Sequence, residues 1–331
     1  MNTFNTNTMP VSSSQSTPDL QTADFIRAQV LRGIALNREP GYHFSGNFLD
    51  LSFDHVDPEC AELSVDVAPH CADHSGQLSM GGLAILADLA MSGVIRAGLE
   101  PFTRLATVTM NLQFSGVPRV GRVIARGAMH GFVQDVNGRQ GMSTVSILGD
   151  AGVVCQGSAT FMVLPPPKGV TLYPVPHRKR GQSPTPEIPK GRLTADEKKL
   201  VARAEQALTQ SATEGGAFVD WFWGVQAKPI RGGVRSLVQN GMHIGNRVGH
   251  VQGGIMLSLA ALNAIAALSD QWALTAISAW FISPGEGRVL KVTSKIVHQG
   301  RLVAVVRTEV IGKSGRKVFE VVTTHASKRN K

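Results

Sequence analysis

The spacing of hydrophobic residues changes several times along the first half of the chain. Apolar residues at helical spacing predict a helix over 19–36, and alternation from 44 to 67 is typical of strands. A nearly continuous apolar stretch from about 80 to 98 predicts a helix that is buried on almost every face. Strand-like runs follow at 103–115, 121–134 and 139–163, the last of them bent or split at 149–152.

The same order of elements returns in the second half. A charged amphipathic stretch over 194–209 predicts a helix, and Thr194-Ala-Asp-Glu197 forms a capping box at its start. The apolar stretch from Gly253 to about Leu268 predicts a second buried helix. Strands are expected before it at 217–226 and 233–242 and after it at 273–283, 287–299, 301–312 and 316–327, with a hairpin turn at 313–316.

A repeated motif precedes each buried helix. The stretch Asp73–Gly82 returns as Asn246–Gly254, and three pairs keep the same spacing along the chain: Asp73 with Asn246, Gly76 with Gly249, and Gly81 with Gly254. A repeat this long indicates a duplicated domain. Within the helices the copies differ, because Asp88 corresponds to Ala261. At this position of the buried helix, therefore, only the first copy carries an ionisable group.

The chain of 331 residues is long enough for about two domains. Residues 1–18 are rich in Asn, Ser and Thr and are expected to form a disordered tail and no signal peptide. The Pro-rich stretch 165–192 is typical of an extended linker. We therefore expect an N-terminal domain over 19–164 and a C-terminal domain over 193–331, each with a leading helix.

Composition restricts the surroundings and the partners. No apolar run appears long enough to cross a bilayer, so no membrane partner is expected. The three cysteines, Cys60, Cys71 and Cys155, are odd in number and lack metal-ligand spacing, which favours a reducing cytoplasm and a role as small core residues. The net charge of +9 favours an anionic partner. With two tyrosines and no stacking motif, a phosphate-bearing small molecule is favoured over nucleic acid.

These motifs resemble those of the hotdog-fold acyl-CoA thioesterases of the phenylacetate-degradation type, within the 4-hydroxybenzoyl-CoA thioesterase-like superfamily. The resemblance lies in the order strand, Asn-x-x-Gly-x-x-His-Gly-Gly, buried helix with an acid, and strand meander, over about 44–163 and 217–327. It implies an α+β fold of two hotdog domains, each an antiparallel sheet wrapped around a long central helix. The domains would pair as a pseudo-dimer within one chain, and such units commonly assemble into homo-oligomers.

The resemblance also implies one composite site. Asn246, Gln252 and Gly253 would face Asp88 across the two halves, while Gly249 and Gly254 would bind substrate. In this scheme Asp88 is the general base, acting through a water that Thr107 orients, and the Gly253 amide donates to the developing oxyanion. No metal or other cofactor is implied, since coenzyme A is part of the substrate. The mirror combination of Asp73, Ser79, Met80 and Gly81 with Ala261 would be inactive.

One substitution separates this chain from the family motif. Gln252 stands where the motif has His, so its side chain can form hydrogen bonds but cannot carry a proton at neutral pH. Other double-hotdog thioesterases hold a water with an Asp, a Thr or Ser, and a Gln, and the set Asp88, Thr107 and Gln252 is similar.

Each candidate residue also has a purely structural explanation. Asp88 could cap a neighbouring turn or pair with Arg96, although a spacing of two helical turns disfavours direct pairing. Gly253 and Gly254 could allow tight packing, Asn246 could belong to a turn, and Thr107 could be an ordinary strand threonine. Two other functions therefore stay open. One is a non-catalytic protein that binds acyl-CoA or an acyl carrier. The other is a hydratase or dehydratase of enoyl thioesters, for which Gln in place of His is unfavourable.

Overall fold

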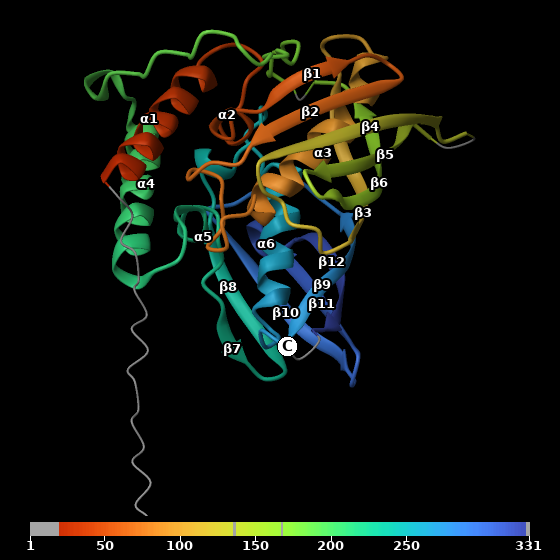
Figure 1. Ribbon diagram of the computed structural model, residues 1–331. Helices are drawn as coiled ribbons and strands as arrows, with labels where there is room; N and C mark the ends of the chain where they lie inside the picture. Colours follow the sequence, from red (N-terminus) through yellow and green to blue (C-terminus); the bar gives the residue numbers. More distant parts are fainter. Residues whose placement is uncertain (1–19, 135–136, 167, 329–331) are drawn as a thin grey trace, which may run out of the picture.

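The computed structural model describes residues 20–134, 137–166 and 168–328 (Figure 1). The predicted disordered tail, 1–18, lies outside the described residues. The first half contains α1 (Leu20–Asn37), α2 (Phe44–Phe48), β1 (Ser52–Val56), β2 (Cys60–Asp66), α3 (Met80–Ala97), β3 (Arg104–Phe114), β4 (Arg122–Phe132), β5 (Arg139–Gly149) and β6 (Gly152–Leu164).

The second half repeats this order after a short turn, η1 (Lys190–Arg192). It contains α4 (Ala195–Glu214), α5 (Phe218–Phe222), β7 (Lys228–Ile230), β8 (Gly233–Gln239), η2 (Met242–Ile244), α6 (Gly253–Ile265), β9 (Trp272–Phe281), β10 (Val289–Gln299), β11 (Val303–Ile311), η3 (Lys313–Gly315) and β12 (Lys317–Ser327). The two predicted buried helices are α3 and α6, and the predicted split near Gly149 separates β5 from β6.

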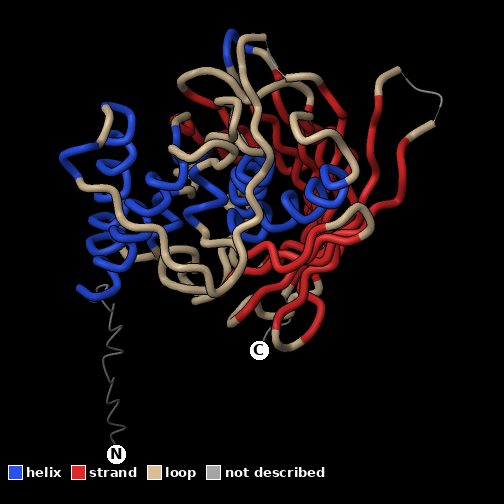
Figure 2. The backbone as a smooth tube through the Cα atoms, turned by 90° about the horizontal axis from the view of Figure 1, so that it is seen from above, coloured by secondary structure: helices blue, strands red, loops and turns tan. Residues whose placement is uncertain are grey.

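A single antiparallel sheet joins the two halves. Within the described residues its twelve strands run in the order β1-β2-β4-β5-β6-β3-β9-β12-β11-β10-β8-β7. The halves meet where β3 pairs with β9, with Asn111 opposite Ser278. The sheet curves around α3 and α6, whereas α1 and α4 pack together away from the strands (Figures 1 and 2). The molecule therefore consists of two sheet-around-helix units that share one continuous sheet.

The central helices explain the long apolar stretches of the sequence. Helix α3 is capped by the Ser79 hydroxyl, which accepts a hydrogen bond from the Gly82 amide at 3.2 Å, and α3 packs against α6. Among the described residues, α3 is the one helix that is long and apolar enough to cross a membrane, which corrects the expectation that no apolar run is long enough. Its burial inside the sheet is that of a core helix.

Two segments predicted as strands begin with short helices instead. Residues 44–48 form α2, and the strand predicted at 217–226 is wrong because 218–222 form α5. In both, phenylalanines lie four residues apart, so they face the same side of a helical turn. Phe48 and Phe222 then pack with ring centroids 5.4 Å apart.

Cys60 is exposed, unlike the buried Cys71 and Cys155, so the prediction that all three cysteines are core residues is wrong for Cys60.

The Pro-rich segment has no helix or strand over 168–189 but contacts both halves of the molecule. The Phe53 amide donates to the Arg178 carbonyl at 2.8 Å, and Arg247 Nη1 donates to the Tyr173 carbonyl at 2.7 Å. Leu172 is buried. We call residues 168–189 the strap. The domain boundaries at 164 and 193 stay a prediction.

Candidate active site

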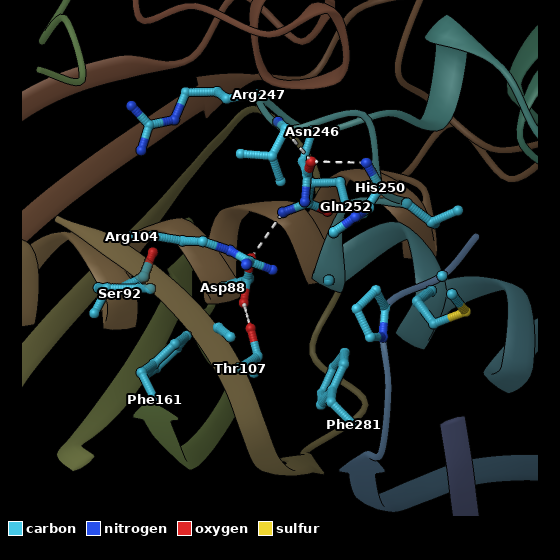
Figure 3. A pocket seen from close by; sticks show the side chains of 18 of the residues that line it. Asp88, Ser92, Arg104, Thr107, Phe161, Asn246, Arg247, His250, Gln252 and Phe281 are labelled. Carbon is cyan, nitrogen blue, oxygen red and sulfur yellow. Dashed lines mark hydrogen bonds between the residues drawn. The ribbon is translucent and has the colours of Figure 1, made fainter. Parts of the chain in front are cut away.

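The carboxylate of Asp88 lies where the two halves meet. Asp88 is on α3, and its Oδ2 accepts a hydrogen bond from Gln252 Nε2 at 2.7 Å, while its Oδ1 accepts one from the Thr107 hydroxyl at 3.1 Å. Figure 3 shows these two side chains reaching Asp88 from different sides. The side chain is held in a single orientation, and each carboxylate oxygen keeps a lone pair for another donor.

Burial changes the acidity of this group. Asp88 is only 7 % exposed, and loss of hydration raises its pKa to about 6 against an ordinary 3.8. The Thr107 hydroxyl, the charge of Arg96 and the Gln252 amide each lower this pKa and limit the rise. Asp88 is therefore mostly ionised at neutral pH yet more basic than an exposed aspartate, which suits a general base.

The orientation of Gln252 follows from its position at the start of α6. Its Oε1 accepts a hydrogen bond from the Ile255 amide at 2.9 Å and so caps the helix. Because the oxygen is engaged with a donor, the other end of the amide, Nε2, must face Asp88. Gln252 thus serves as both a helix cap and a hydrogen-bond donor to the carboxylate, and it is 4 % exposed.

The first residue of α6 touches the same carboxylate. A Cβ on Gly253 would lie 3.1 Å from Thr107 Oγ1 and 3.3 and 3.4 Å from the two Asp88 oxygens. Glycine therefore permits the close approach. The first amides of a helix have no carbonyl partner within the helix and form its positive end. A carbonyl oxygen beside Gly253 would meet such a donor.

The position of Thr107 depends on an irregularity in β3. The pairing of β3 with β6 shifts between Thr107 and Thr109, which is the mark of a β-bulge. Bulges change the direction in which neighbouring side chains point and are frequent beside active sites. Here the Thr107 hydroxyl points at Asp88.

The other predicted residues have different surroundings. Asn246 lines the pocket, but its Oδ1 accepts the amides of Val248 and His250 at 3.0 and 3.1 Å, so it also holds the motif loop. Gly249 lies in that loop at φ +79°, a conformation that favours glycine. A Cβ on Gly254 would lie 2.5 Å from the Ala84 carbonyl, so this glycine allows α6 to pack against α3. Gly249 and Gly254 are outside the described lining of the pocket.

A cavity of about 380 Å³ opens beside Asp88. Both halves contribute to its wall, with Leu89 and Phe161 from the first and Met256 and Phe281 from the second. Asp88 is the one acidic side chain in the described lining, whereas the basic ones are His43, Arg96, Arg104, Arg247 and His250. The site therefore combines an apolar wall, one carboxylate and an excess of positive charge.

The mirror position has no such group. Ala261 is completely buried, Ser79 caps α3, and Asp73 pairs with Arg119 at 3.0 Å. The Trp223 ring lies against the motif, since a Cβ on Gly81 would be 3.0 Å from its Cε3. Trp223 is thus a core residue and not part of the Asp88 pocket.

Solved structures with the same architecture exist despite low identity. A Lactobacillus plantarum protein, classed provisionally as an oleoyl thioesterase, matches with a TM-score of 0.52 at 10% identity, over 82% of this chain and 97% of that one. A Novosphingobium aromaticivorans protein, classed provisionally as a thioesterase, matches with a TM-score of 0.52 at 13% identity, over 84% and 99%. The chain has the double hotdog fold. The predicted fold class is thereby confirmed.

A plant enzyme shares this fold. The 12:0-ACP thioesterase from Umbellularia californica matches with a TM-score of 0.51 at 7% identity, over 81% of this chain and 94% of that one. No protein-family model and no curated protein sequence matches the chain. At such identities the likeness shows the double hotdog fold and not the function.

Sequence reasoning missed part of the pocket. Arg96 lies two helical turns after Asp88 on the same face of α3, and this spacing was a usable signal. His43 and Arg104 lie outside the repeated motifs, and no pattern in the sequence connects them with the pocket. Arg247 lines the pocket, whereas Arg231 lies just before β8 and Arg235 lies on it, both outside the described lining.

Proposed function

We propose that this protein hydrolyses acyl-CoA thioesters at the Asp88 pocket, with one such site per chain. Ionised Asp88 takes a proton from a water, and the water oxygen attacks the thioester carbon. The carbonyl oxygen becomes an anion, to which the Gly253 amide donates. When the carbon–sulfur bond breaks, the proton held by Asp88 passes to the thiolate, which gives a free acid and coenzyme A.

The observation that carries this proposal is the contact between Asp88 and the start of α6. A general base and a positive helix end are adjacent, and both touch a cavity of suitable size. Thr107 and Gln252 hold the carboxylate so that one lone pair on each oxygen is free to accept from a water. Gln252 cannot carry a proton, so Asp88 performs both proton transfers.

The fold supports the same substrate class. The structures that share it include the 12:0-ACP thioesterase and the oleoyl thioesterase named above. The basic residues around the pocket suit a phosphorylated carrier such as coenzyme A. These features favour acyl thioesters and do not choose between coenzyme A and an acyl carrier protein.

The test is turnover of a panel of acyl-CoAs by the wild type and by Asp88→Asn. We expect hydrolysis by the wild type and at least a hundredfold loss of kcat/KM in the variant, the usual range for a general base. Binding of the same acyl-CoAs, measured by calorimetry, should be retained in the variant. Asp270→Asn, at an exposed aspartate after α6, is the matched control and should keep full activity.

Other outcomes would point to the alternatives. Tight acyl-CoA binding without turnover by the wild type would identify a binding protein, in which Gln252 reflects lost catalysis. Hydration of crotonyl-CoA without hydrolysis would identify a hydratase. Equal hydrolysis by the wild type and Asp88→Asn would remove the proposed role of Asp88.

A further inference from the structure

The Asp88 pocket has an exposed end and a covered end. At the exposed end Ile282 is 52 % exposed, and His250 pairs with Glu286 at 3.2 Å near the surface. At the other end the strap lies over the pocket, with Leu172 4 % exposed in the lining and the adjacent Tyr173 46 % exposed at the surface. In the view of Figure 3, Asp88 lies between Ser92 and Arg247 on one side and His250 on the other.

Helix α3 leads from Asp88 toward the covered end. Asp88, Ser92 and Arg96 are four residues apart in turn, so they share one face of α3, and all three line the pocket. A ligand with its thioester carbon at Asp88 can therefore extend along this face. The bulky nucleotide of coenzyme A must remain in solvent and so leaves by the exposed end, which directs the acyl group to Arg96.

The covered end carries two guanidinium groups that form no ion pair in the described part of the chain, and the nearest carboxylate that acts on Arg96 is that of Asp88. Arg96 Nη1 donates to the Thr103 carbonyl at 2.8 Å, and Arg247 Nη1 donates to the Tyr173 carbonyl of the strap. In the described part of the chain no carboxylate pairs with either guanidinium. Burial and the nearby charge of Arg247 lower the pKa of Arg96 to about 10, and the charge of Asp88 offsets only part of this effect. The Nε2 of His43, which also lines this end, is buried and has no hydrogen-bond partner.

Such an arrangement is unfavourable in the empty protein, because two partly buried cations repel each other. An anion between the two guanidinium groups would relieve this repulsion. It would also accept hydrogen bonds from N–H groups of Arg96 and Arg247 that have no other partner among the described residues. The pantetheine arm of coenzyme A is neutral, and a cavity of about 380 Å³ is too small for the nucleotide as well as an acyl chain. The anion that reaches Arg96 must therefore belong to the acyl group.

We propose that Arg96 and Arg247 bind a carboxylate at the far end of the acyl group, so that the preferred substrates are monothioesters of dicarboxylic acids. This inference rests on the proposed thioesterase function. A guanidinium matches a carboxylate through two parallel hydrogen bonds. Asp88 and Arg96 are about 12 Å apart along the helix axis, and both line the pocket, so a medium-length acyl chain spans the gap.

The experiment compares adipyl-CoA, hexanoyl-CoA and the monomethyl ester of adipyl-CoA, which have similar shape but differ in charge. We expect the wild type to prefer adipyl-CoA over both neutral thioesters by about 10- to 100-fold in kcat/KM, the effect of hydrogen bonds to a charged group. Arg96→Gln should remove most of this preference. Arg104→Gln, at another arginine of the lining, is the matched control and should leave the ratio between substrates unchanged.

The same comparison with pantetheine thioesters identifies the source of the anion. If the preference for adipyl persists without the nucleotide, the acyl carboxylate is bound, as we propose. If Arg96→Gln weakens all coenzyme A thioesters equally and has no effect on pantetheine thioesters, Arg96 binds a coenzyme A phosphate and the inference is wrong.

The failure of this inference can be told apart from the failure of the proposed function. Hydrolysis of adipyl-CoA and hexanoyl-CoA at equal rates would overturn the carboxylate site but keep the thioesterase. If no thioester is hydrolysed, calorimetry with the same ligands decides. Tighter binding of adipyl-CoA that Arg96→Gln abolishes would support the carboxylate site, and equal binding of both would overturn it.

Discussion

Replacement of Asp88 by asparagine should make the folded protein more stable at neutral pH. Burial raises the pKa of Asp88 from 3.8 to about 6, which corresponds to a penalty of about 3 kcal/mol on the ionised form. Asparagine has nearly the same shape and carries no charge. Its oxygen can accept from Gln252, and its NH₂ group can donate to the Thr107 hydroxyl, so both contacts of the carboxylate can be kept.

The sign of the pH dependence follows from proton binding. Between about pH 4 and pH 6 folded Asp88 holds a proton that the unfolded chain has released, so the stability of the wild type falls as the pH rises. The penalty is about 1 kcal/mol at pH 4.5 and reaches about 3 kcal/mol at pH 8. The stability advantage of Asp88→Asn should therefore grow by about 2 kcal/mol between these two values.

Urea unfolding of both proteins at pH 4.5, 6 and 8 measures this difference. Asp270→Asn is the matched control, because it removes an exposed carboxylate and should give a difference from the wild type that does not follow this trend. A constant difference between wild type and Asp88→Asn across the pH range would refute the reasoning. So would an Asp88→Asn protein that is less stable than the wild type at pH 8.

Three further predictions concern the surroundings of Asp88. If Asp88 acts as the base, kcat/KM of the wild type should rise with pH with a midpoint near 6, and Thr107→Val, which removes a donor to the carboxylate, should move that midpoint to higher pH. Gly253→Ala should lower kcat/KM at least about tenfold, because its Cβ would crowd the carboxylate, while the free energy of unfolding changes by less than about 1 kcal/mol. Gln252→Ala should cost about 1 kcal/mol in urea unfolding through the lost cap of α6, and its pH–rate midpoint should also rise. A midpoint that stays in place in both Thr107→Val and Gln252→Ala would show that Asp88 is not the titrating base.

The parts of the site that the sequence predicts are those with a local signature. An acid in an apolar helix identified Asp88, and the repeated glycine motif identified the start of α6 as its counterpart. The contact between Asp88, Thr107 and Gln252 needed the family resemblance, because these residues are far apart in the chain and no local pattern links them. In the structure Thr107 and Gln252 both donate to the Asp88 carboxylate, and the catalytic roles of the three residues stay a prediction.

Other parts could not be predicted, for definite physical reasons. A five-residue helix such as α5 spans little more than one turn, so its aromatic residues give no clear helical period, and the pattern over 217–226 predicts a strand instead. The strap has neither helical nor strand spacing, so nothing in the sequence indicated that Leu172 covers the pocket. Motif residues can also serve the backbone, as the loop contacts of Asn246 and the positive φ of Gly249 illustrate.

The difference between the copies has an energetic rationale. A buried carboxylate like Asp88 costs the fold about 3 kcal/mol at neutral pH, a large share of the stability of a typical domain. A second one on α6 would add a similar cost, and it would be useful only with an open pocket beside it. Ala261 avoids the charge, and Trp223 packs against the matching glycine motif. In the proposed mechanism one half supplies the acid and the other the helix end, while the mirror position contributes to the core.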